Sequence, residues 1–433
     1  MIALSISESW LTPDVIKAVS NEIHHVLRVA QIEGLAAPEM AIQFIEGQII
    51  EGKRAVSICS EDKTVTLVTM ESSRGCSISE HQNFQSHYHI HYCEQITGKE
   101  DFSQTERCDD VENIFIAYAP QPNRSISELW EVSDEIRTLS SAASISEQFP
   151  HQFIQRHLAW LSVLLILDFP CEDALIIARS LCNVSRETWP RNFHDFPEIS
   201  SSTTDVIHQS YKFGAVDEAD LSLYPVVDDV KWVDELLRLG VKTIQLRIKN
   251  PLQPDLEQQI KQAILLGKEH RAQVFINDYW KLAIQYQAFG VHLGQEDLCT
   301  ANIQALSDAG IRLGISTHGY WEILKAQQLC PSYIALGHIF PTTTKQMPSK
   351  PQGLVRLKLY QQLVDSIAND RNRSIPTVAI GGINLHNAAT VLEQGVSSLA
   401  VVRAITQAEN TALAIDAFQQ VIQFRRKHDA ITQ

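Results

Sequence analysis

The chain has 433 residues, a formal net charge of −15 and a hydrophobic fraction of 44%. This length predicts two domains, and the hydrophobic fraction is high enough for each of them to bury a core. The negative charge disfavours a nucleic acid or an anionic membrane as a partner, because phosphate groups require surplus Lys and Arg.

The distribution of apolar residues and cysteines predicts a cytoplasmic protein. Met1 is not followed by a basic segment and a long apolar stretch, so we expect no secretory signal. The most apolar run, Leu158–Leu167, is about half the length needed to cross a bilayer. The eight cysteines lack paired spacing, which favours a reducing compartment over a disulfide framework.

Residues 1–205 are expected to form a separate N-terminal α/β domain of unknown role. Apolar periodicity predicts helices over Pro13–Ala30, Ala37–Ile49, Phe153–Leu167 and Glu172–Cys182. Short β-branched runs predict strands over Ala55–Cys59, Thr64–Met70 and Ile114–Tyr118.

Three histidines and a cysteine alternate in this half, at His87, His89, His91 and Cys93. Alternation places them on one face of a strand. Zinc sites usually draw their ligands from separated segments, since neighbours on one strand converge poorly on a tetrahedron. We therefore favour the solvated face of an edge strand over a metal site.

The segment Asp168–Pro190 resembles the last helices of hydroxymethylpyrimidine phosphate kinases. The Gly-rich anion-binding turn of such kinases is absent, because Arg156–Trp160 occupies its place. The resemblance implies a degenerate kinase-like domain that has lost catalysis and serves an accessory, binding or regulatory role.

The stretch Phe196–Asp220 is predicted to be a linker, since it carries a proline, a Ser/Thr cluster and no sustained apolar period. The domain boundary is expected near residues 205–220, with the second domain over 215–433.

Beyond the linker, eight short apolar runs alternate with amphipathic stretches. The runs lie at 222–228, 243–249, 273–278, 290–294, 312–316, 333–338, 377–383 and 398–405. Near-continuous apolar strands followed by helices indicate parallel strands covered on the outside. An open doubly wound sheet would have a Gly-rich turn after its first strand, where Asp228–Val230 stands. The fold class is therefore α/β, with a C-terminal (β/α)₈ TIM barrel.

Polar side chains gather where these strands end, which is where barrel enzymes hold their chemistry. Gln245, Arg247 and Lys249 alternate and share one face, and two cations with an amide suit a polyphosphate. The alternative is that Arg247 and Lys249 only extend to solvent at the rim.

Two carboxylates follow the next strands, at Asp278 beside Asn277 and at Asp297. Each alone could be a helix N-cap. Together, beside the cations, they favour Mg²⁺, which accepts one or two carboxylates and keeps sites open for phosphate oxygens. Ser316 offers a hydroxyl to the same place. His318 could be a base, a helix cap or a surface residue.

A monophosphate site is predicted at the other side of the barrel mouth. The loop after the sixth strand carries Thr342, Thr343, Thr344 and Lys345, a cluster of donors for oxyanions. Gly381-Gly382 and Val402-Arg403 follow the last two strands, which form the recurrent barrel phosphate site. The glycines could also serve a tight turn, and both interpretations are compatible.

A metal-bound diphosphate facing a phosphorylated acceptor indicates group transfer with pyrophosphate leaving. We find no Ser-His-Asp arrangement and no activated cysteine, so covalent catalysis is not expected.

The ordered motifs of this half resemble thiamine phosphate synthase. They are QLRIK (245–249), FINDYW (275–280), GVHLGQEDL (290–298), GISTH (314–318), GHIFPTTTKQMPSKPQGL (337–354), AIGGI (379–383) and AVVRAI (400–405). The resemblance implies that a hydroxymethylpyrimidine diphosphate is joined to a thiazole phosphate, with one Mg²⁺ per active site. The products would be thiamine phosphate and pyrophosphate. In this family the diphosphate is thought to leave first, giving a pyrimidine-methyl cation.

The resemblance also implies residue roles. The pyrimidine diphosphate would be held by Gln245, Leu246, Arg247, Ile248, Lys249, Asn277, Ser316 and Lys345, of which Arg247, Ser316 and Lys345 are the catalytic candidates. Mg²⁺ would bind Asp278 and Asp297. The thiazole phosphate would contact Thr342, Thr343, Thr344, Gly382, Val402 and Arg403. Arg403 departs from the serine that many members carry.

Two other functions are considered. A synthase-like thiazole tautomerase need not retain Asp278, Asp297, Lys249 or the Thr-rich loop, so their presence disfavours it. A non-catalytic sensor of thiamine precursors is disfavoured by the complete site. The expected partners are small phosphorylated substrates, and the oligomeric state stays open.

Overall fold

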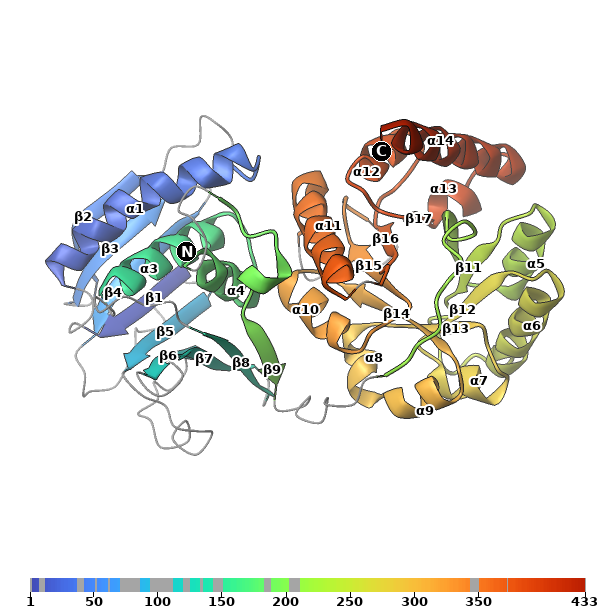
Figure 1. Cartoon of the computed structure of the whole chain (residues 1–433), viewed down its shortest axis with the longest axis horizontal. Coiled ribbons are helices and arrows are strands. Elements are labelled where there is room, and N and C mark those ends of the chain that lie inside the picture. The colour runs from blue at the N-terminus through green and yellow to red at the C-terminus, as the bar shows by residue number, and fades with distance from the viewer. Residues whose placement is uncertain are drawn as a thin grey trace. The chain divides into compact units, whose positions relative to one another are not determined.

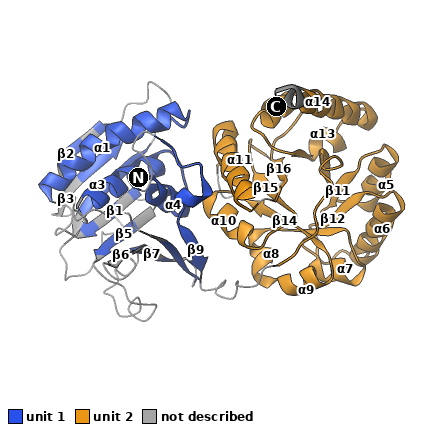
Figure 2. Cartoon of the chain, in the orientation of Figure 1, with its two compact units in different colours: residues 1–205 blue, residues 206–433 orange. Residues whose placement is uncertain are grey.

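The chain divides into two compact units, Met1–Asp205 and Val206–Gln433 (Figures 1 and 2). The computed structural model describes residues 2–7, 12–36, 43–50, 53–60, 63–70, 86–93, 112–119, 125–132, 135–142, 151–182, 188–201, 211–342, 350–371 and 373–432. Within these ranges, no helix combines the length and the apolar character that a membrane span requires. We call the two parts the N-terminal unit and the barrel unit.

The N-terminal unit is built on a nine-stranded mixed sheet with the order β2-β3-β4-β1-β5-β6-β7-β8-β9. Its strands are β1 (Ile2–Ser7), β2 (Gln43–Ile50), β3 (Lys53–Cys59), β4 (Thr64–Met70), β5 (Ser86–Cys93), β6 (Glu112–Ala119), β7 (Ser125–Val132), β8 (Glu135–Ala142) and β9 (Glu198–Ser201). The four central strands pair in parallel, and the outer strands pair antiparallel.

In the described part of this unit, three long helices accompany the sheet: α1 (Pro13–Ile32), α3 (His151–Ile166) and α4 (Cys171–Leu181). Helix α1 begins after Thr12, whose side chain accepts a hydrogen bond from the Val15 amide at 3.4 Å, and Pro13 suits the first turn. Helix α3 packs between α1 and α4, and Figure 1 shows α1 and α3 lying across the strands. An α/β fold for this half is therefore confirmed.

Two expectations for the N-terminal unit are wrong. The helix expected over Ala37–Ile49 is not formed in its described part, since β2 begins at Gln43 and pairs with β3. Cross-strand pairing outweighs the helical periodicity there. The linker expected to start at Phe196 instead contains β9, which pairs with β8.

The histidine-bearing strand β5 is also not an edge strand, because it lies between β1 and β6. The half-buried His91 ring stacks on Phe115 at 4.3 Å and shares a 2.9 Å hydrogen bond with Asn113. The side chains of His87, His89 and Cys93 lie outside the described residues. Among the side chains that are described, no group of three His, Cys, Asp or Glu is arranged to hold a metal ion.

The barrel unit is a closed barrel of eight parallel strands that neighbour one another in chain order, so the TIM barrel is confirmed. Its strands are β10 (Leu223–Val227), β11 (Thr243–Leu246), β12 (Gln273–Asn277), β13 (Gly290–Leu293), β14 (Arg312–Thr317), β15 (Tyr333–Gly337), β16 (Thr377–Ile380) and β17 (Ser398–Val401). Pairing of β10 with β17 closes the ring.

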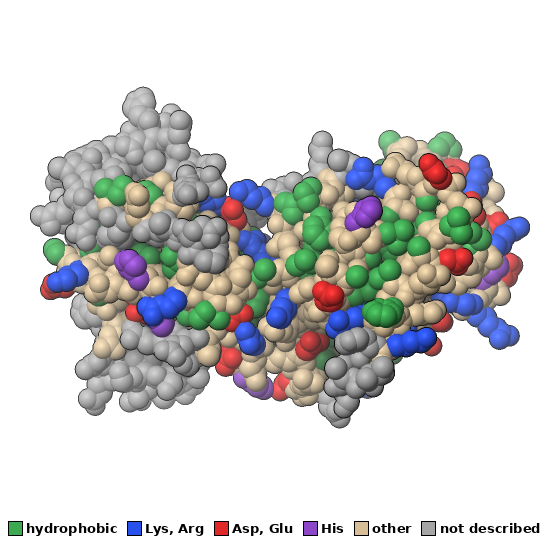
Figure 3. Space-filling view, turned by 90° about the horizontal axis from the view of Figure 1, so that it is seen from above, with side chains coloured by type: hydrophobic (Ala, Val, Ile, Leu, Met, Phe, Trp, Pro, Cys, Tyr) green, Lys and Arg blue, Asp and Glu red, His purple; other side chains and the backbone are tan. Residues whose placement is uncertain are grey.

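Helices surround this ring (Figure 1). They are α5 (Val230–Arg238), α6 (Leu256–Glu269), α7 (Trp280–Gln285), α8 (Gln295–Thr300), α9 (Ile303–Asp308), α10 (Tyr320–Gln328), α11 (Gly353–Asp370), α12 (Ala388–Leu392), α13 (Arg403–Thr406) and α14 (Thr411–Thr432). On the face seen in Figure 3, Lys and Arg side chains of this unit are interspersed with Asp and Glu. The negative net charge is therefore not gathered into one patch on that face.

Side chains fill the inside of the barrel. The buried cluster includes Tyr224, Phe275, Tyr333, Val378 and Ala400, one from each of five strands. Burying this apolar surface drives closure of the ring and leaves the carboxyl ends of the strands open to loops. Polar residues that follow the strands are thus carried to one rim.

Candidate active site

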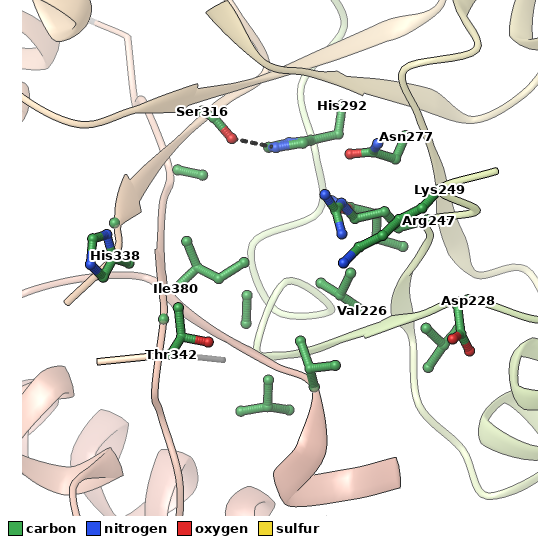
Figure 4. A pocket seen from close by; sticks show the side chains of 18 of the residues that line it. Val226, Asp228, Arg247, Lys249, Asn277, His292, Ser316, His338, Thr342 and Ile380 are labelled. Atoms are coloured by element: carbon green, nitrogen blue, oxygen red, sulfur yellow. Dashed lines mark hydrogen bonds between the residues drawn. The ribbon is translucent and has the colours of Figure 1, made fainter. Parts of the chain in front are cut away.

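A cavity of about 1260 Å³ opens at the carboxyl ends of the barrel strands. Its walls come from the ends of all eight strands and from the loops that follow them. Figure 4 shows the side chains that line it, with Arg247 and Lys249 on one side and His338 and Thr342 on the other. The cavity is large enough for two small organic substrates side by side.

The cationic side of the cavity follows β11. This strand ends at Leu246, so Arg247 and Lys249 belong to the loop, and Figure 4 shows both side chains reaching into the cavity. Arg247 is half-buried, and its guanidinium makes no hydrogen bond or ion pair with any described residue. A half-buried guanidinium that faces open space suits an anionic ligand, above all a phosphate.

The acidic side follows β12 and β13. Asp278 comes directly after β12 with φ of 64°, and Asp297 lies in the first turn of α8. Both line the cavity, and one oxygen of Asp297 accepts a hydrogen bond from the Gly294 amide at 3.2 Å. Burial and then the Asp278 carboxylate raise the pKa of the Tyr279 hydroxyl.

These two carboxylates fit a magnesium ion. Mg²⁺ is commonly held by one or two carboxylates while substrate phosphates and waters complete its octahedron. Asp278 and Asp297 face the same open cavity as Arg247 and Lys249, so room is left for those further ligands. Buried Asn277 adds an amide beside them that bonds to no described side chain.

The opposite side of the cavity is formed by the ends of β15, β16 and β17. Gly381 and Gly382 have positive φ of 106° and 67°, and a Cβ atom on Gly382 would lie 2.7 Å from that of Phe340. Glycine is required here because the β16 end lies against the loop that follows β15. The same surface continues through Thr342, Val402 and exposed Arg403.

A chain of hydrogen bonds runs from the barrel interior to the cavity. The Gln245 amide nitrogen lies 3.4 Å from the Tyr224 hydroxyl, which lies 2.9 Å from that of Tyr333. The Tyr333 hydroxyl lies 2.7 Å from Nδ1 of His292, and Nε2 of His292 lies 2.8 Å from the Ser316 hydroxyl. Burial raises the pKa of Tyr224 and of Tyr333 well above the usual tyrosine range.

Gly314 makes room for this chain. A Cβ atom at Gly314 would overlap the ring of Tyr333 on the neighbouring strand. The Tyr333 ring also stacks on His292, with centroids 5.7 Å apart and an interplanar angle of 16°. The ring positions of Tyr333 and His292 are thus fixed by packing as well as by hydrogen bonds.

Comparisons with known proteins identify the family of the chain. The model of the family described as thiamine monophosphate synthase matches residues 223–405, from the first strand of the barrel to α13. Thiamine-phosphate synthase of Enterobacter sp. (strain 638) is 56% identical over 194 residues, which are 45% of this chain and 88% of the relative. The chain belongs to the thiamine-phosphate synthase family.

Two further proteins are similar to this chain. Thiamine-phosphate synthase of Pectobacterium atrosepticum is 54% identical over 205 residues, covering 47% of this chain and 93% of the relative. The solved thiamine phosphate pyrophosphorylase from Pyrococcus furiosus is 32% identical and covers 48% of this chain and 98% of its own, with a TM-score of 0.41.

Most of the residues singled out from the sequence for a synthase site line this one cavity. They are Gln245, Arg247, Ile248, Lys249, Asn277, Asp278, Asp297, Ser316, Thr342, Gly382, Val402 and Arg403. Leu246 is buried and does not line the cavity. Thr343, Thr344 and Lys345 lie outside the described residues.

His318 follows β14 and lines the rim of the cavity. The sequence left open whether it is a base, a helix cap or a surface residue. Its Nδ1 lies 2.8 Å from a carboxylate oxygen of Glu322, and its backbone amide donates to the same oxygen at 2.7 Å. This contact ties the turn before α10 to the first residues of the helix. The Glu322 carboxylate is therefore the group that caps this turn, and the His318 imidazole holds that carboxylate in place.

Sequence reasoning missed three members of the hydrogen-bonded chain: Tyr224, His292 and Tyr333. A signal for His292 was present, because a histidine stands in an otherwise apolar strand and alternates with Gly290. Two positions apart on a strand share a face, so both turn inward. The partners could not be found that way, since Tyr333 lies 41 residues from His292 and 109 from Tyr224.

Proposed function

We propose that the barrel unit is a magnesium-dependent transferase that joins a hydroxymethylpyrimidine diphosphate to a thiazole phosphate. Thiamine phosphate and pyrophosphate are the products. The observation that carries the proposal is the half-buried Arg247, which lacks a protein partner among the described residues. It lines the same cavity as Lys249 and the carboxylates of Asp278 and Asp297, which follow the two neighbouring strands. Membership in the thiamine-phosphate synthase family supports the same reaction.

The transfer breaks one bond and forms another. The bond between the pyrimidine methylene carbon and the diphosphate oxygen breaks, and its electron pair leaves with the oxygen. Arg247, Lys249 and Lys345 neutralise the charge that develops there, which is the principal requirement of such a step. Asp278 and Asp297 would hold Mg²⁺, which when bound would supply further positive charge to the diphosphate.

The thiazole nitrogen then donates its lone pair to the methylene carbon. That nitrogen carries no hydrogen in the thiazole, so the chain needs no general base for the step. We assign Gln245, Asn277 and Ser316, with the segment through Leu246 and Ile248, to the pyrimidine diphosphate. The thiazole phosphate is assigned to Thr342, Thr343, Thr344, Gly382, Val402 and Arg403.

The cavity and the composition of the chain are consistent with small phosphorylated substrates. The scattered cysteines support a cytoplasmic enzyme. Because the net charge is negative, its anionic ligands need to be held by local cations.

The test is release of pyrophosphate from the two substrates, measured with Mg²⁺ or with EDTA. Metal-dependent formation of thiamine phosphate is expected. The Asp278→Ala variant should lose activity by about 100–1000-fold, as when one charge-stabilising group is removed from an active site. The Asp234→Ala variant is the control, because Asp234 pairs with Arg238 on the outer surface of α5.

Folded wild-type protein that forms no thiamine phosphate under any of these conditions would refute the proposed reaction. Equal activity with Mg²⁺ and with EDTA would refute the metal assignment alone.

A further inference from the structure

The hydrogen-bonded chain from Gln245 to Ser316 connects five strands and ends in the cavity. Gln245 lies on β11, Tyr224 on β10, Tyr333 on β15, His292 on β13 and Ser316 on β14. Four of its members are buried, with Tyr224 at 1%, Tyr333 at 0%, Gln245 at 4% and His292 at 7% exposure. Ser316 is the member that is partly exposed, and Figure 4 shows its hydroxyl bonded to His292 beside Asn277.

The direction of these hydrogen bonds follows from the donors at the buried end. The amide nitrogen of Gln245 can only donate, so the Tyr224 oxygen accepts from it. Either tyrosine hydroxyl could donate across their 2.9 Å contact, but Tyr224 already accepts from Gln245. Its own hydrogen needs an acceptor, and among the described residues the one within reach is the Tyr333 oxygen, so we take Tyr224 as the donor. Tyr333 in turn donates to Nδ1 of His292.

The tautomer of His292 follows from this direction. Nδ1 of His292 accepts a hydrogen bond and therefore carries no hydrogen. In a neutral imidazole the hydrogen resides on Nε2, which donates it to the Ser316 oxygen. The hydrogen of the Ser316 hydroxyl is consequently left to point into the cavity. The opposite direction requires the Gln245 amide to be turned over, which exchanges its oxygen and nitrogen.

We infer that His292 is a positioning residue for the proposed transfer, which holds the Ser316 hydroxyl with its hydrogen directed at the diphosphate substrate. This inference rests on the proposed function of the same site. A diphosphate offers acceptor oxygens only, so a hydroxyl that donates stabilises it. A hydroxyl already donating to His292 would turn its lone pairs toward the anion and repel it.

Two substitutions at His292 separate this role from a structural one. In His292→Gln the side-chain amide reaches the place of Nε2 and can still donate to Ser316. In His292→Asn the shorter side chain reaches the place of Nδ1, so it can bond Tyr333 but not Ser316. Both variants lose the imidazole ring. If His292 served only in packing, the activity of both variants should therefore fall.

We expect kcat/KM of His292→Asn to fall about 10–100-fold, as for the loss of a hydrogen bond to a charged group. The same fall is expected for Ser316→Ala, and the double variant should be no worse than Ser316→Ala alone. His292→Gln should retain most of the activity. Equal losses in the two His292 variants, or additive losses with Ser316→Ala, would overturn the inference.

A second measurement does not depend on activity. The ¹⁵N resonances of the His292 ring, identified by their absence in His292→Gln, report which nitrogen carries hydrogen. We expect hydrogen on Nε2 in the wild type and a mixture of the two forms in Tyr333→Phe, which removes the donor to Nδ1. Hydrogen on Nδ1 in an active wild type would refute the inference and leave the transferase standing. An inactive wild type with hydrogen on Nε2 would refute only the transferase.

Discussion

Both units bury polar side chains, but they place them in different surroundings. In the barrel unit the buried Gln245 and His292 belong to a chain of hydrogen bonds that ends at an open cavity. In the N-terminal unit Glu128 of β7 and His157 of α3 are both 0% exposed, 3.5 Å apart, and lie between the sheet and a helix. Buried polar residues alone therefore do not indicate a functional site. Buried polar residues that are connected to an open cavity do indicate one.

Glu128 and His157, which we call the enclosed pair, also affect a neighbouring tyrosine. The Tyr92 hydroxyl lies 3.2 Å from Nδ1 of His157. Burial and then the Glu128 carboxylate raise the pKa of Tyr92 well above the usual tyrosine range. These groups join β5, β7 and α3, so they are expected to hold the fold of the N-terminal unit and to leave the transferase unaffected.

The largest effect should come from the open site. Replacing Arg247 by Met removes a charge beside the leaving diphosphate and should lower kcat/KM by about 100–1000-fold. The unfolding transition of the N-terminal unit should not move. Arg238→Met is the control, because Arg238 is exposed on α5. Steady-state kinetics measure this change, and a fall in kcat/KM of less than about fivefold would contradict the role of Arg247.

The enclosed pair should show the reverse pattern. Replacing Glu128 by Ala removes the buried carboxylate that lies 3.5 Å from Nε2 of His157 and should destabilise the N-terminal unit by about 1–3 kcal/mol, as for the loss of a buried polar contact. Synthase activity should stay near that of the wild type. Glu198→Ala, at an exposed position of β9, is the control. Urea unfolding gives the stability, and a parallel fall in activity would show that the units are coupled.

A smaller effect concerns the pH dependence of the barrel. The hydroxyl of Tyr333 keeps its proton in the folded state, because burial raises its pKa, and loses it in the unfolded state above pH 10.0. The stability that it contributes is therefore present below pH 10.0 and is lost as the pH rises further. Tyr333→Phe should be less stable by about 1–3 kcal/mol at pH 7.

That difference between wild type and Tyr333→Phe should shrink by about 1.4 kcal/mol for each pH unit above the ordinary tyrosine pKa. The barrel transition can be recognised in the full chain as the one that Mg²⁺ and pyrophosphate shift upward. A difference that stays constant from pH 8 to pH 11 would mean that Tyr333 ionises in the folded protein as readily as in the unfolded chain.

The smallest effect is expected from removing the N-terminal unit. All of the described residues that line the cavity lie between Val226 and Gln407. A chain that starts at Val206 should therefore keep kcat and KM within about twofold, as for a domain with its own core. Substantial loss of activity in a folded fragment would give the N-terminal unit a part in catalysis, and its accessory role would need to be revised.

Much of the barrel could be predicted because each strand and the helix after it are encoded by one short stretch of sequence. A strand such as Gln273–Asn277 is buried along its whole length and is followed at once by its helix, so a short window of sequence contains the signal. The N-terminal sheet is different. Strands β7 (SISELWEV) and β8 (EIRTLSSA) mix polar and apolar residues, and were not recognised. Their stability comes from pairing with neighbours, which no local window shows.

The candidate site also has a part that could be predicted from the sequence and a part that could not. Arg247, Asp278 and Asp297 could be found because each follows a strand, and the carboxyl ends of parallel strands meet at one rim. The order of hydrogen bonds behind Ser316 could not be found, since it depends on which residues of distant strands face each other inside the barrel. The role of the N-terminal unit stays a prediction.

Gly314 has a consequence for how this chain can change. Its missing side chain is the space that the Tyr333 ring occupies, and Gly290 stands in the same relation to the ring of Phe275. Any larger residue at 314 requires a smaller one at 333, and the loss of that ring would interrupt the path to Ser316. Positions 314 and 333 therefore constrain each other, because a larger side chain at 314 and the ring at 333 would occupy the same space.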